Sequence, residues 1–323
     1  MNRTEKMRAT TTEMGSLDWF TSRAFASLKP ISRYDDHTIW DYTDSACLWG
    51  PGSAEAYAKL QDRSSYGAHV TDPETKFITS KASEIVKKLP GQLIYVDLGP
   101  GTAEKEKPIL EEMQRQGKDI IYVPVDINKN ILDAASSRYT KLGVTSIPIQ
   151  STFEELDVSS YLRSKINDFD GRSMFVSLGL TFINYRPEVA LEMLRRIMGK
   201  GGYAFITAEL QEGVNIEEIK AAYSDPIVQD FIQLKLNLLG IKDTDIQNTV
   251  LTNDVLISYI LKTVPEQLQA KGVSPGDEIL TIRTYRHPLK RLREFMDETF
   301  ETDYFLDNVA TNKFAAVLLH ELR

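Results

Sequence analysis

A short segment at positions 92–105, QLIYVDLGPGTAEK, constrains the fold of this chain more than any other stretch. It opens with four apolar, β-favouring residues, LIYV, as found in a strand buried on both faces. Asp97 ends this run, and Gly99-Pro100-Gly101 then turns the chain toward an expected helix. Strand, acidic residue, glycine turn and helix form the first unit of a doubly wound nucleotide-binding sheet. In such a unit, bare backbone at Gly99 and Gly101 and the unpaired N–H groups of the helix would face the ligand.

Strands and helices alternate after this unit. Further strands are expected at 120–125, 146–150, 174–177 and 203–207, and helices at 103–116, 128–142, 153–163 and 187–198. This alternation predicts a parallel sheet with helices on both faces. Two last strands, near 300–306 and 314–319, resemble the closing hairpin of class I S-adenosylmethionine methyltransferases.

The segments outside this sheet predict an added lobe. Aromatic residues crowd positions 34–66, and positions 215–269 read as helices with little strand between them. We therefore expect an α/β fold, with a Rossmann-like class I methyltransferase sheet and an added, mostly helical substrate-binding lobe. The expected parts are an N-terminal helical and aromatic part of the lobe at 1–70, a methyltransferase domain at 71–208 and 287–323, and an inserted substrate-binding part at 209–286.

The composition narrows the classes of partner. The chain has 323 residues and a net charge of -8, which argues against nucleic acid and anionic membranes as partners. Cys47 is the only cysteine, so no internal disulfide or cysteine zinc cluster is possible, and the four histidines show no metal-ligand spacing. The polar start of the chain and the lack of an apolar run of roughly 18 residues predict a cytoplasmic protein with no signal peptide or membrane span.

Positions beyond the glycine turn indicate which nucleotide is bound. The turn is not G-x-G-x-x-G, because Glu104 stands at the third glycine position. Asp126 ends the second strand, where a carboxylate can bind a ribose hydroxyl, and Thr152-Phe153 follows the third strand, where an adenine could be flanked. The lack of G-K-[ST] excludes a P-loop NTPase. The terminal hairpin favours S-adenosylmethionine over a nicotinamide, which stays an alternative.

Five motifs resemble, in this order, the histidine Nα-methyltransferase family of ergothioneine biosynthesis. They are VDLGPGTAEK, YVPVDINKNIL, LGLTFINY, AAYSDP and GDEILTIRTYR. The resemblance runs from about Gly50 to the C-terminus. It implies a Rossmann-like S-adenosylmethionine-dependent domain, an added substrate lobe, a place in secondary metabolism and methylation of the α-amine of an amino acid.

The resemblance also implies roles for single residues on the cofactor side. Gly99 and Lys105 fall on cofactor-side positions of the first motif, and Asp126 falls on the ribose-binding acid. Thr152-Phe153 stands where the family usually has Asp-Phe near the adenine, so a carboxylate acceptor for the adenine amine is missing here.

On the acceptor side, the resemblance implies residues that hold the head group of an amino acid. Asn184 in LTFINY matches the family's asparagine for this head group, and Tyr223 in AAYSDP matches a tyrosine on the substrate carboxylate. A further family tyrosine is only loosely echoed by Tyr66, and Tyr57 is a rival for its role. Each of these side chains could instead serve packing or capping.

The strand expected at 278–286 departs from the family. The family has a glutamate that faces the imidazole and a serine two residues on, whereas this chain has Ile282 and Thr284. Tyr259 replaces a methionine of the family's pocket. A buried carboxylate selects an imidazole strongly, and isoleucine cannot do so. We therefore expect an acceptor other than histidine, with an indole, phenol or aliphatic side chain.

Together these features predict an S-adenosylmethionine-dependent methyltransferase. A neutral amine of a free amino acid or related small amine would attack the sulfonium methyl in line, and no residue stands out as a general base. One alternative is methylation of a guanidine, for which Glu209, Glu212 or Asp225 could supply a carboxylate. The others are a nicotinamide-dependent oxidoreductase and a non-catalytic, methyltransferase-like binding protein.

Overall fold

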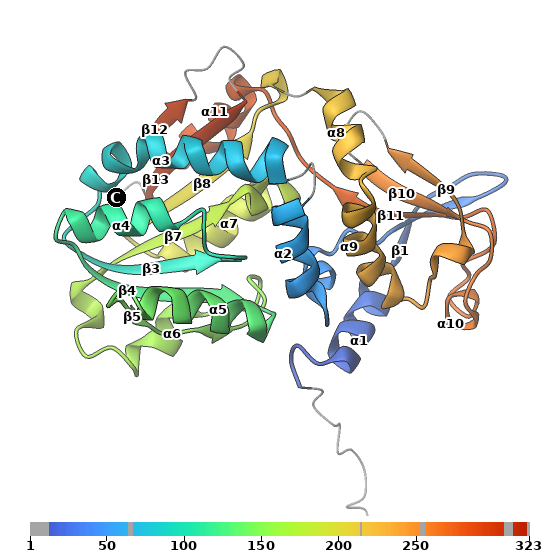
Figure 1. The fold of residues 1–323 in the computed structure, drawn as a ribbon, viewed down its shortest axis with the longest axis horizontal. Helices are drawn as coiled ribbons and strands as arrows, with labels where there is room; N and C mark the ends of the chain where they lie inside the picture. The colour runs from blue at the N-terminus through green and yellow to red at the C-terminus, as the bar shows by residue number, and fades with distance from the viewer. Residues whose placement is uncertain (1–12, 64–66, 214, 252–255, 307–312, 322–323) are drawn as a thin grey trace, which may run out of the picture.

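The computed structural model describes residues 13–63, 67–213, 215–251, 256–306 and 313–321 (Figure 1). Its larger sheet has eight strands in the order β12-β13-β8-β7-β3-β4-β5, with β6 also paired to β4. These strands are β3 (Gln92–Leu98), β4 (Asp119–Asp126), β5 (Thr145–Ser146), β6 (Ile149–Gln150), β7 (Ser173–Gly179), β8 (Tyr203–Glu209), β12 (Phe300–Leu306) and β13 (Phe314–Glu321). The pairs among β3 to β8 are parallel, and β12 and β13 are antiparallel at one edge. The expected parallel sheet with a closing hairpin is confirmed.

Helices cover both faces of this sheet. Alternate residues of β3 point to opposite faces, so Leu93 and Tyr95 pack into one core and Ile94 and Val96 into the other. The first core takes in α3 (Asp72–Lys87), α4 (Lys107–Arg115) and α5 (Lys129–Thr140). The second core takes in α6 (Val158–Arg163), α7 (Pro187–Met198) and α11 (Leu289–Asp297).

Two helices start later than the sequence predicts, and both differences leave loop at the carboxyl edge of the sheet. The helix after the glycine turn begins at Lys107 instead of position 103, because Ala103 has a positive φ of 57° that does not fit a helix. The helix expected from position 153 begins at Val158, where the Asp157 side chain accepts a hydrogen bond from the Ser160 N–H.

A second, smaller sheet lies beside the first (Figure 1), so the expected helical lobe also contains strands that the sequence analysis did not predict. Its order is β1-β2-β11-β10-β9, built from β1 (Lys29–Arg33), β2 (Thr38–Asp41), β9 (Ile246–Leu251), β10 (Leu256–Leu261) and β11 (Glu278–Arg283). β9 and β10 fall inside the block that the sequence predicts as helical. β2 and β11 pair in parallel although more than 200 positions separate them, as in Ile39 with Glu278. Such distant pairing decides strand formation and leaves no local sequence pattern.

Helices from the N-terminal part of the chain and from the inserted part pack on the smaller sheet and share one apolar core with it. They are α1 (Leu17–Ser27), α2 (Ser53–Arg63), α8 (Ile216–Tyr223), α9 (Pro226–Asn237) and α10 (Glu266–Gln269). α2 lies between the two sheets in Figure 1 and packs against α9. The N-terminal aromatics belong to this core: Trp40 is buried and donates from its indole N–H to Asp277 at 2.9 Å.

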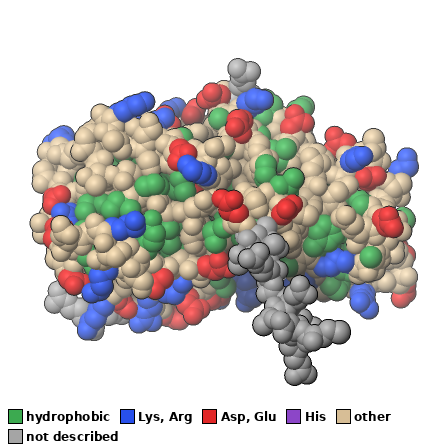
Figure 2. All heavy atoms as spheres, turned by 90° about the horizontal axis from the view of Figure 1, so that it is seen from below, with side chains coloured by type: hydrophobic (Ala, Val, Ile, Leu, Met, Phe, Trp, Pro, Cys, Tyr) green, Lys and Arg blue, Asp and Glu red, His purple; other side chains and the backbone are tan. Residues whose placement is uncertain are grey.

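Three features of the described residues relate to the partners considered above: the surface charge, the length of the apolar helices and the grouping of possible metal ligands. On the face drawn in Figure 2, basic and acidic side chains are interspersed and do not gather in a single basic stripe. In the described part of the chain, no helix is both long and apolar enough to cross a bilayer, and no His, Cys, Asp and Glu side chains cluster as a metal site. Cys47, the single cysteine, is buried and unpaired.

Candidate active site

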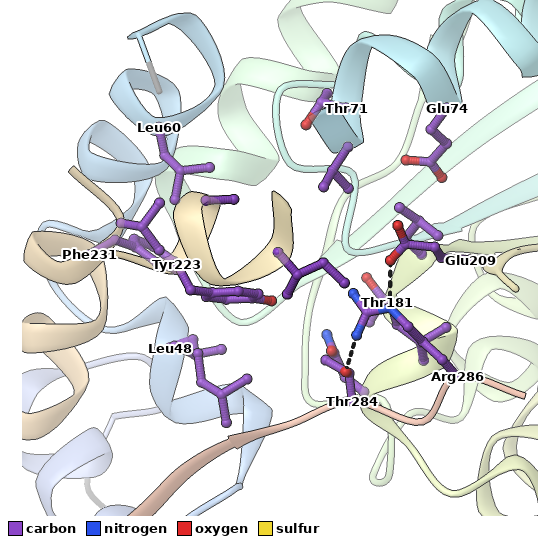
Figure 3. Close-up of a pocket in the computed structure, with 18 of the residues that line it drawn as sticks. Leu48, Leu60, Thr71, Glu74, Thr181, Glu209, Tyr223, Phe231, Thr284 and Arg286 are labelled. Atoms are coloured by element: carbon purple, nitrogen blue, oxygen red, sulfur yellow. Dashed lines mark hydrogen bonds and ion pairs between the residues drawn. The ribbon is translucent and has the colours of Figure 1, made fainter. Parts of the chain in front are cut away.

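Two adjoining cavities lie where the carboxyl ends of the parallel strands face the second lobe. The edge groove, of about 70 Å³, is lined by Ser45, Ala46, Leu48, Trp49, Gly99, Asp126, Ile127, Ser151, Thr152, Phe153, Glu154, Thr181, Asn184 and Tyr185. The interlobe cavity, of about 140 Å³, extends between both lobes (Figure 3). Four residues line both spaces: Leu48, Trp49, Thr181 and Asn184. The two cavities therefore meet at these side chains.

The glycine turn forms one wall of the edge groove. Gly99 has φ 71° and Gly101 has φ 55°, a backbone conformation that favours glycine. A side chain at Gly99 would start 3.4 Å from the ring of Phe153, and one at Gly101 would start 3.1 Å from Tyr57. Gly99 lines the edge groove, whereas the missing side chain at Gly101 leaves room for the ring of Tyr57.

The edge groove is also lined by the residues predicted for ribose and adenine. Asp126 is buried at the end of β4 and accepts a hydrogen bond from the Asn128 N–H at 2.7 Å. Burial raises the pKa of Asp126 to about 7. Thr152 and Phe153 line the same groove. The Thr152 hydroxyl is buried with no hydrogen-bond partner in the described protein, as expected for a group that meets a polar ligand atom.

Lys105 lines the interlobe cavity and does not line the edge groove. Its Nζ is 3.3 Å from Oε2 of Glu74, which is 1% exposed and whose Oε1 accepts from the Thr207 hydroxyl. Burial lowers the pKa of Lys105, but the nearby carboxyl groups, led by Glu74, raise it by more. Glu106 is also buried here, and burial together with Asp97 raises its pKa well above the usual range.

Four residues predicted for the acceptor come together around the interlobe cavity: Asn184, Tyr223, Ile282 and Thr284. Asn184 ends a 3-10 helix, Leu180–Asn184, that directly follows β7. The Tyr285 N–H donates to the carbonyl of Ile183 at 2.6 Å, which ties the end of β11 to this helix. The ring of Tyr223 extends into the cavity from the end of α8 (Figure 3). Burial raises the pKa of its hydroxyl, and the nearby Arg286 opposes this shift.

Two of the predicted residues lie elsewhere. Tyr259 on β10 is 2% exposed, does not line either cavity, and donates to Gln229 Oε1 at 3.1 Å. Gln229 in turn donates to the Tyr223 carbonyl. Tyr259 is therefore linked to a cavity residue, Tyr223, through Gln229. Tyr66 lies outside the described residues, whereas its rival Tyr57 lines the interlobe cavity.

The cavity also contains a charged cluster whose role the sequence analysis missed. Arg286 donates from Nε to Oε2 of Glu209 at 2.6 Å and from a second nitrogen to the Thr284 hydroxyl (Figure 3). Lys313 Nζ is 3.5 Å from the other oxygen of Glu209. The sequence did contain a signal for Arg286. Residues two apart on an extended segment share a side, so Arg286 could have been expected on the same side as Ile282 and Thr284.

The three carboxylates considered for a guanidine substrate all have partners within the protein. Glu209 is paired with the two cations of this cluster. Glu212 is exposed and accepts from the Leu289 N–H, and Asp225 caps α9 by accepting from the Ile227 N–H.

The fold and the two cavities define a Rossmann-like nucleotide site joined to a separate cavity under a second lobe. The family model described as "Histidine-specific methyltransferase, SAM-dependent" matches residues 52–253, and the chain belongs to this family. Membership implies S-adenosylmethionine as the cofactor. Asp126, the unpartnered hydroxyl of Thr152 and the open turn at Gly99 fit the nucleoside of that molecule.

The curated relatives that match this chain share about a quarter of the aligned residues with it. The N-methyltransferase fsqC of Aspergillus fumigatus is 25% identical over 63% of this chain and 56% of its own length. A histidine N-alpha-methyltransferase of Mycobacterium tuberculosis is 25% identical over 48% of this chain and 47% of its own. The chain thus spans about half the length of the curated relatives it matches. Among solved structures, an S-adenosylmethionine-dependent methyltransferase of Clostridium acetobutylicum is 14% identical, with a TM-score of 0.44 over 83% of this chain and 97% of that one.

Proposed function

We propose that this protein transfers a methyl group from S-adenosylmethionine to the amine of a free amino acid or a related small amine. The observation that carries the proposal is the junction of the two cavities at Asn184 and Thr181. A nucleoside in the edge groove and an acceptor in the interlobe cavity would meet there. Family membership supports methyl transfer as the reaction.

The cofactor would be held along the carboxyl edge of the larger sheet. Asp126 would bind a ribose hydroxyl, with Thr152 and Phe153 beside the base. Gly99 and Gly101 would let the ligand lie against the backbone, and Glu74 with Lys105 offers a carboxylate and an ammonium for the amino-acid tail. S-adenosylmethionine supplies an electrophilic methyl group on a sulfonium.

The protein's own part in the reaction is alignment and exclusion of water. Asn184 would hold the acceptor's head group at the junction, and Leu48 and Trp49 would cover the junction from the second lobe. The Trp49 carbonyl accepts from Asn128 at 3.1 Å, so this cover is tied to the end of β4. Alignment of two reactants can lower a barrier by about 7–11 kcal/mol in favourable cases.

The wall of the interlobe cavity favours an apolar acceptor side chain over histidine. Its apolar members are Leu48, Trp49, Leu60, Val70, Leu180, Ile183, Ile219, Ala222, Val228, Phe231, Ile232 and Ile282. Ile282 offers no hydrogen bond to an imidazole, so a buried imidazole nitrogen there would stay unpaired. Guanidine methylation is disfavoured because Glu209 already neutralises cations of the protein itself.

A mass-spectrometric screen tests the proposal. The protein is incubated with S-adenosylmethionine carrying a deuterated methyl group and with each amino acid and a set of simple amines. Labelled product from amino acids with aromatic or aliphatic side chains is expected. Label transfer to none of these acceptors, by protein that binds S-adenosylhomocysteine in calorimetry, would refute the proposed acceptor class.

A further inference from the structure

The edge groove lies between parts of the chain that belong to different lobes. The 3-10 helix Ser45–Trp49, which packs into the core of the second lobe, contributes Ser45, Ala46, Leu48 and Trp49 to its lining. The other lining residues lie at or beyond the carboxyl ends of β3, β4, β6 and β7. A nucleoside in this groove would contact both lobes, so its entry and release depend on how firmly the two lobes are joined there.

Three side chains join the lobes at the groove, and we call them the clasp. The Ser45 hydroxyl donates to the Tyr185 hydroxyl oxygen at 3.2 Å, and the Tyr185 hydroxyl donates to Oε1 of Glu154 at 3.3 Å. Tyr185 directly follows the 3-10 helix after β7, and Glu154 lies in the loop between β6 and α6. All three residues line the groove. Burial raises the pKa of Tyr185, so its hydroxyl keeps the proton that it donates.

Arg23 holds both ends of the clasp in place. Its guanidinium donates to the two oxygens of Asp44 at 2.7 and 3.2 Å, and Asp44 caps the helix by accepting from the Ala46 N–H at 3.0 Å. A nitrogen of the same guanidinium lies 4.0 Å from Oε2 of Glu154. The start of the helix and the Glu154 carboxylate are therefore joined twice, through Tyr185 and through Arg23.

The clasp end of the helix is held less firmly than its other end. The Glu154 side chain is 47% exposed, and an exposed ion pair at 4.0 Å contributes little. The neutral hydrogen bond between Ser45 and Tyr185 shifts an equilibrium by only about 2- to 10-fold. At the other end, Cys47 is buried in the core of the second lobe, and the Trp49 carbonyl is hydrogen-bonded. The contacts of the clasp can therefore break and reform while the rest of the helix stays in place.

We propose that the clasp closes the edge groove over the nucleoside and opens each time S-adenosylmethionine enters or S-adenosylhomocysteine leaves. Ser45, Tyr185 and Glu154 thereby act as positioning residues, because they work through the fit between the lobes. A gate of this kind limits both directions of exchange, since each requires the open form. The inference goes beyond the proposed function, because it concerns exchange of the family's cofactor and holds for any acceptor.

Stopped-flow fluorescence of S-adenosylhomocysteine binding tests the inference, with Trp49 in the groove as the reporter. Tyr185→Phe keeps the ring and removes both hydrogen bonds of the clasp. We expect its association and dissociation rate constants each to rise about fivefold, and Kd to change by less than about twofold. A residue that only contacts the ligand would behave differently, because its loss would speed dissociation and leave association unchanged.

Ser45→Ala and Glu154→Ala should each raise both rate constants by about two- to fivefold. Added to Tyr185→Phe, Ser45→Ala should have no further effect, because the bond that it removes is already lost. Tyr161→Phe and Glu155→Ala are the matched controls, since both residues are exposed and line neither cavity. Both controls should exchange the ligand like the wild-type protein.

An association rate constant that stays at the wild-type value in Tyr185→Phe and Ser45→Ala would overturn the inference, whatever the change in dissociation. So would folded wild-type protein that does not bind S-adenosylhomocysteine. If Tyr185→Phe does not fold, as its thermal melting would show, Ser45→Ala and Glu154→Ala decide. Failure to methylate any amine refutes the proposed acceptor class and leaves these rate constants unaffected, so the two proposals fail separately.

Discussion

The two joined cavities are lined by different kinds of side chain. The edge groove contains the buried carboxyl group of Asp126 and the Thr152 hydroxyl, which has no hydrogen-bond partner in the described protein. The interlobe cavity has a largely apolar wall, into which two ion-paired groups are set: Glu74 with Lys105, and Glu209 with Arg286 and Lys313. Each cavity therefore suits the ligand proposed for it, a polar nucleoside in the edge groove and an apolar acceptor side chain between the lobes.

The largest effect is expected at the boundary between the two cavities. Asn184→Ala removes a polar side chain that lines both cavities, so alignment should suffer and the affinity for S-adenosylhomocysteine should change little. We expect kcat/KM for the amino acid to fall by about 100-fold, with a steep rise in KM, in line with the cost of misplacing reacting groups.

Asn237→Ala, an exposed asparagine at the end of α9, is the matched control for this change. Steady-state kinetics and calorimetry on both variants provide the measurement. Unchanged kinetics in Asn184→Ala would remove Asn184 from the site.

A second prediction concerns the edge groove. Asp126→Asn should weaken S-adenosylhomocysteine binding by about 30-fold, because a hydrogen bond to a charged acceptor is worth roughly 1.5–3 kcal/mol. The Thr152 side of the groove is left intact. Asp133→Asn, at an exposed position of α5, should bind normally. Equal affinity of Asp126→Asn and wild-type protein in calorimetry would show that the ribose is not bound there.

The same carboxyl group predicts a dependence on pH. The pKa values of Asp126 and Asp97 are both raised by burial to about 7, so both groups gain a proton as the pH falls through that value. The ionised form of Asp126 accepts hydrogen bonds from a ribose better than the protonated form. Affinity for S-adenosylhomocysteine should therefore fall between pH 8 and about 6, and less steeply in Asp126→Asn. An affinity that is flat with pH in the wild-type protein would contradict this account of Asp126.

A smaller effect is expected on the apolar wall of the interlobe cavity. Ile282→Glu places a carboxylate in the cavity, and histidine binding should improve by about tenfold, the worth of one charge-assisted hydrogen bond. Binding of an apolar amino acid should weaken at the same time. Ile31→Glu, at an exposed position of β1, is the control. A folded Ile282→Glu protein that gains no histidine binding in calorimetry would move Ile282 away from the acceptor side chain.

The core behind the interlobe cavity contains one further buried cation, Lys235. Its Nζ donates to the Thr281 carbonyl at 2.9 Å, next to Ile282, and burial lowers its pKa to about 8. Between pH 8 and about 10.5 the folded state holds fewer protons than the unfolded state, so the free energy of unfolding should rise with pH by roughly 1 kcal/mol per unit. Urea unfolding at several pH values measures this slope, which should vanish in Lys235→Met. A slope that persists there would assign it to other groups.

The contrast between the two cavities also explains how much the sequence could predict. The sheet side of the edge groove is built from successive strand–turn–helix units, so Gly99, Asp126 and Thr152-Phe153 could be placed from local pattern alone. The interlobe cavity joins segments around positions 48, 74, 184, 223 and 286, and local pattern does not say which of these meet. The resemblance to the family predicted roles for Asn184 and Tyr223, but it predicted none for Arg286. Of the smaller sheet only β11 was expected, for the same reason, since β11 pairs with β2 across most of the chain.

Tyr259 shows the limit of position-by-position transfer. It occupies the place of a family pocket residue by register, yet its hydroxyl is bonded to Gln229, away from both cavities. Burial in the core and lining of a cavity look alike in a sequence, because both favour a large, mostly apolar side chain.

The most direct test of the proposed arrangement is the location of the transferred methyl group. Tandem mass spectrometry of the product made from tryptophan and S-adenosylmethionine with a deuterated methyl group reads this location. The arrangement of the amine at Asn184 and the side chain on the apolar wall predicts the label on the α-nitrogen. Label on a side-chain atom, with the α-amine unmodified, would contradict the orientation on which the account depends.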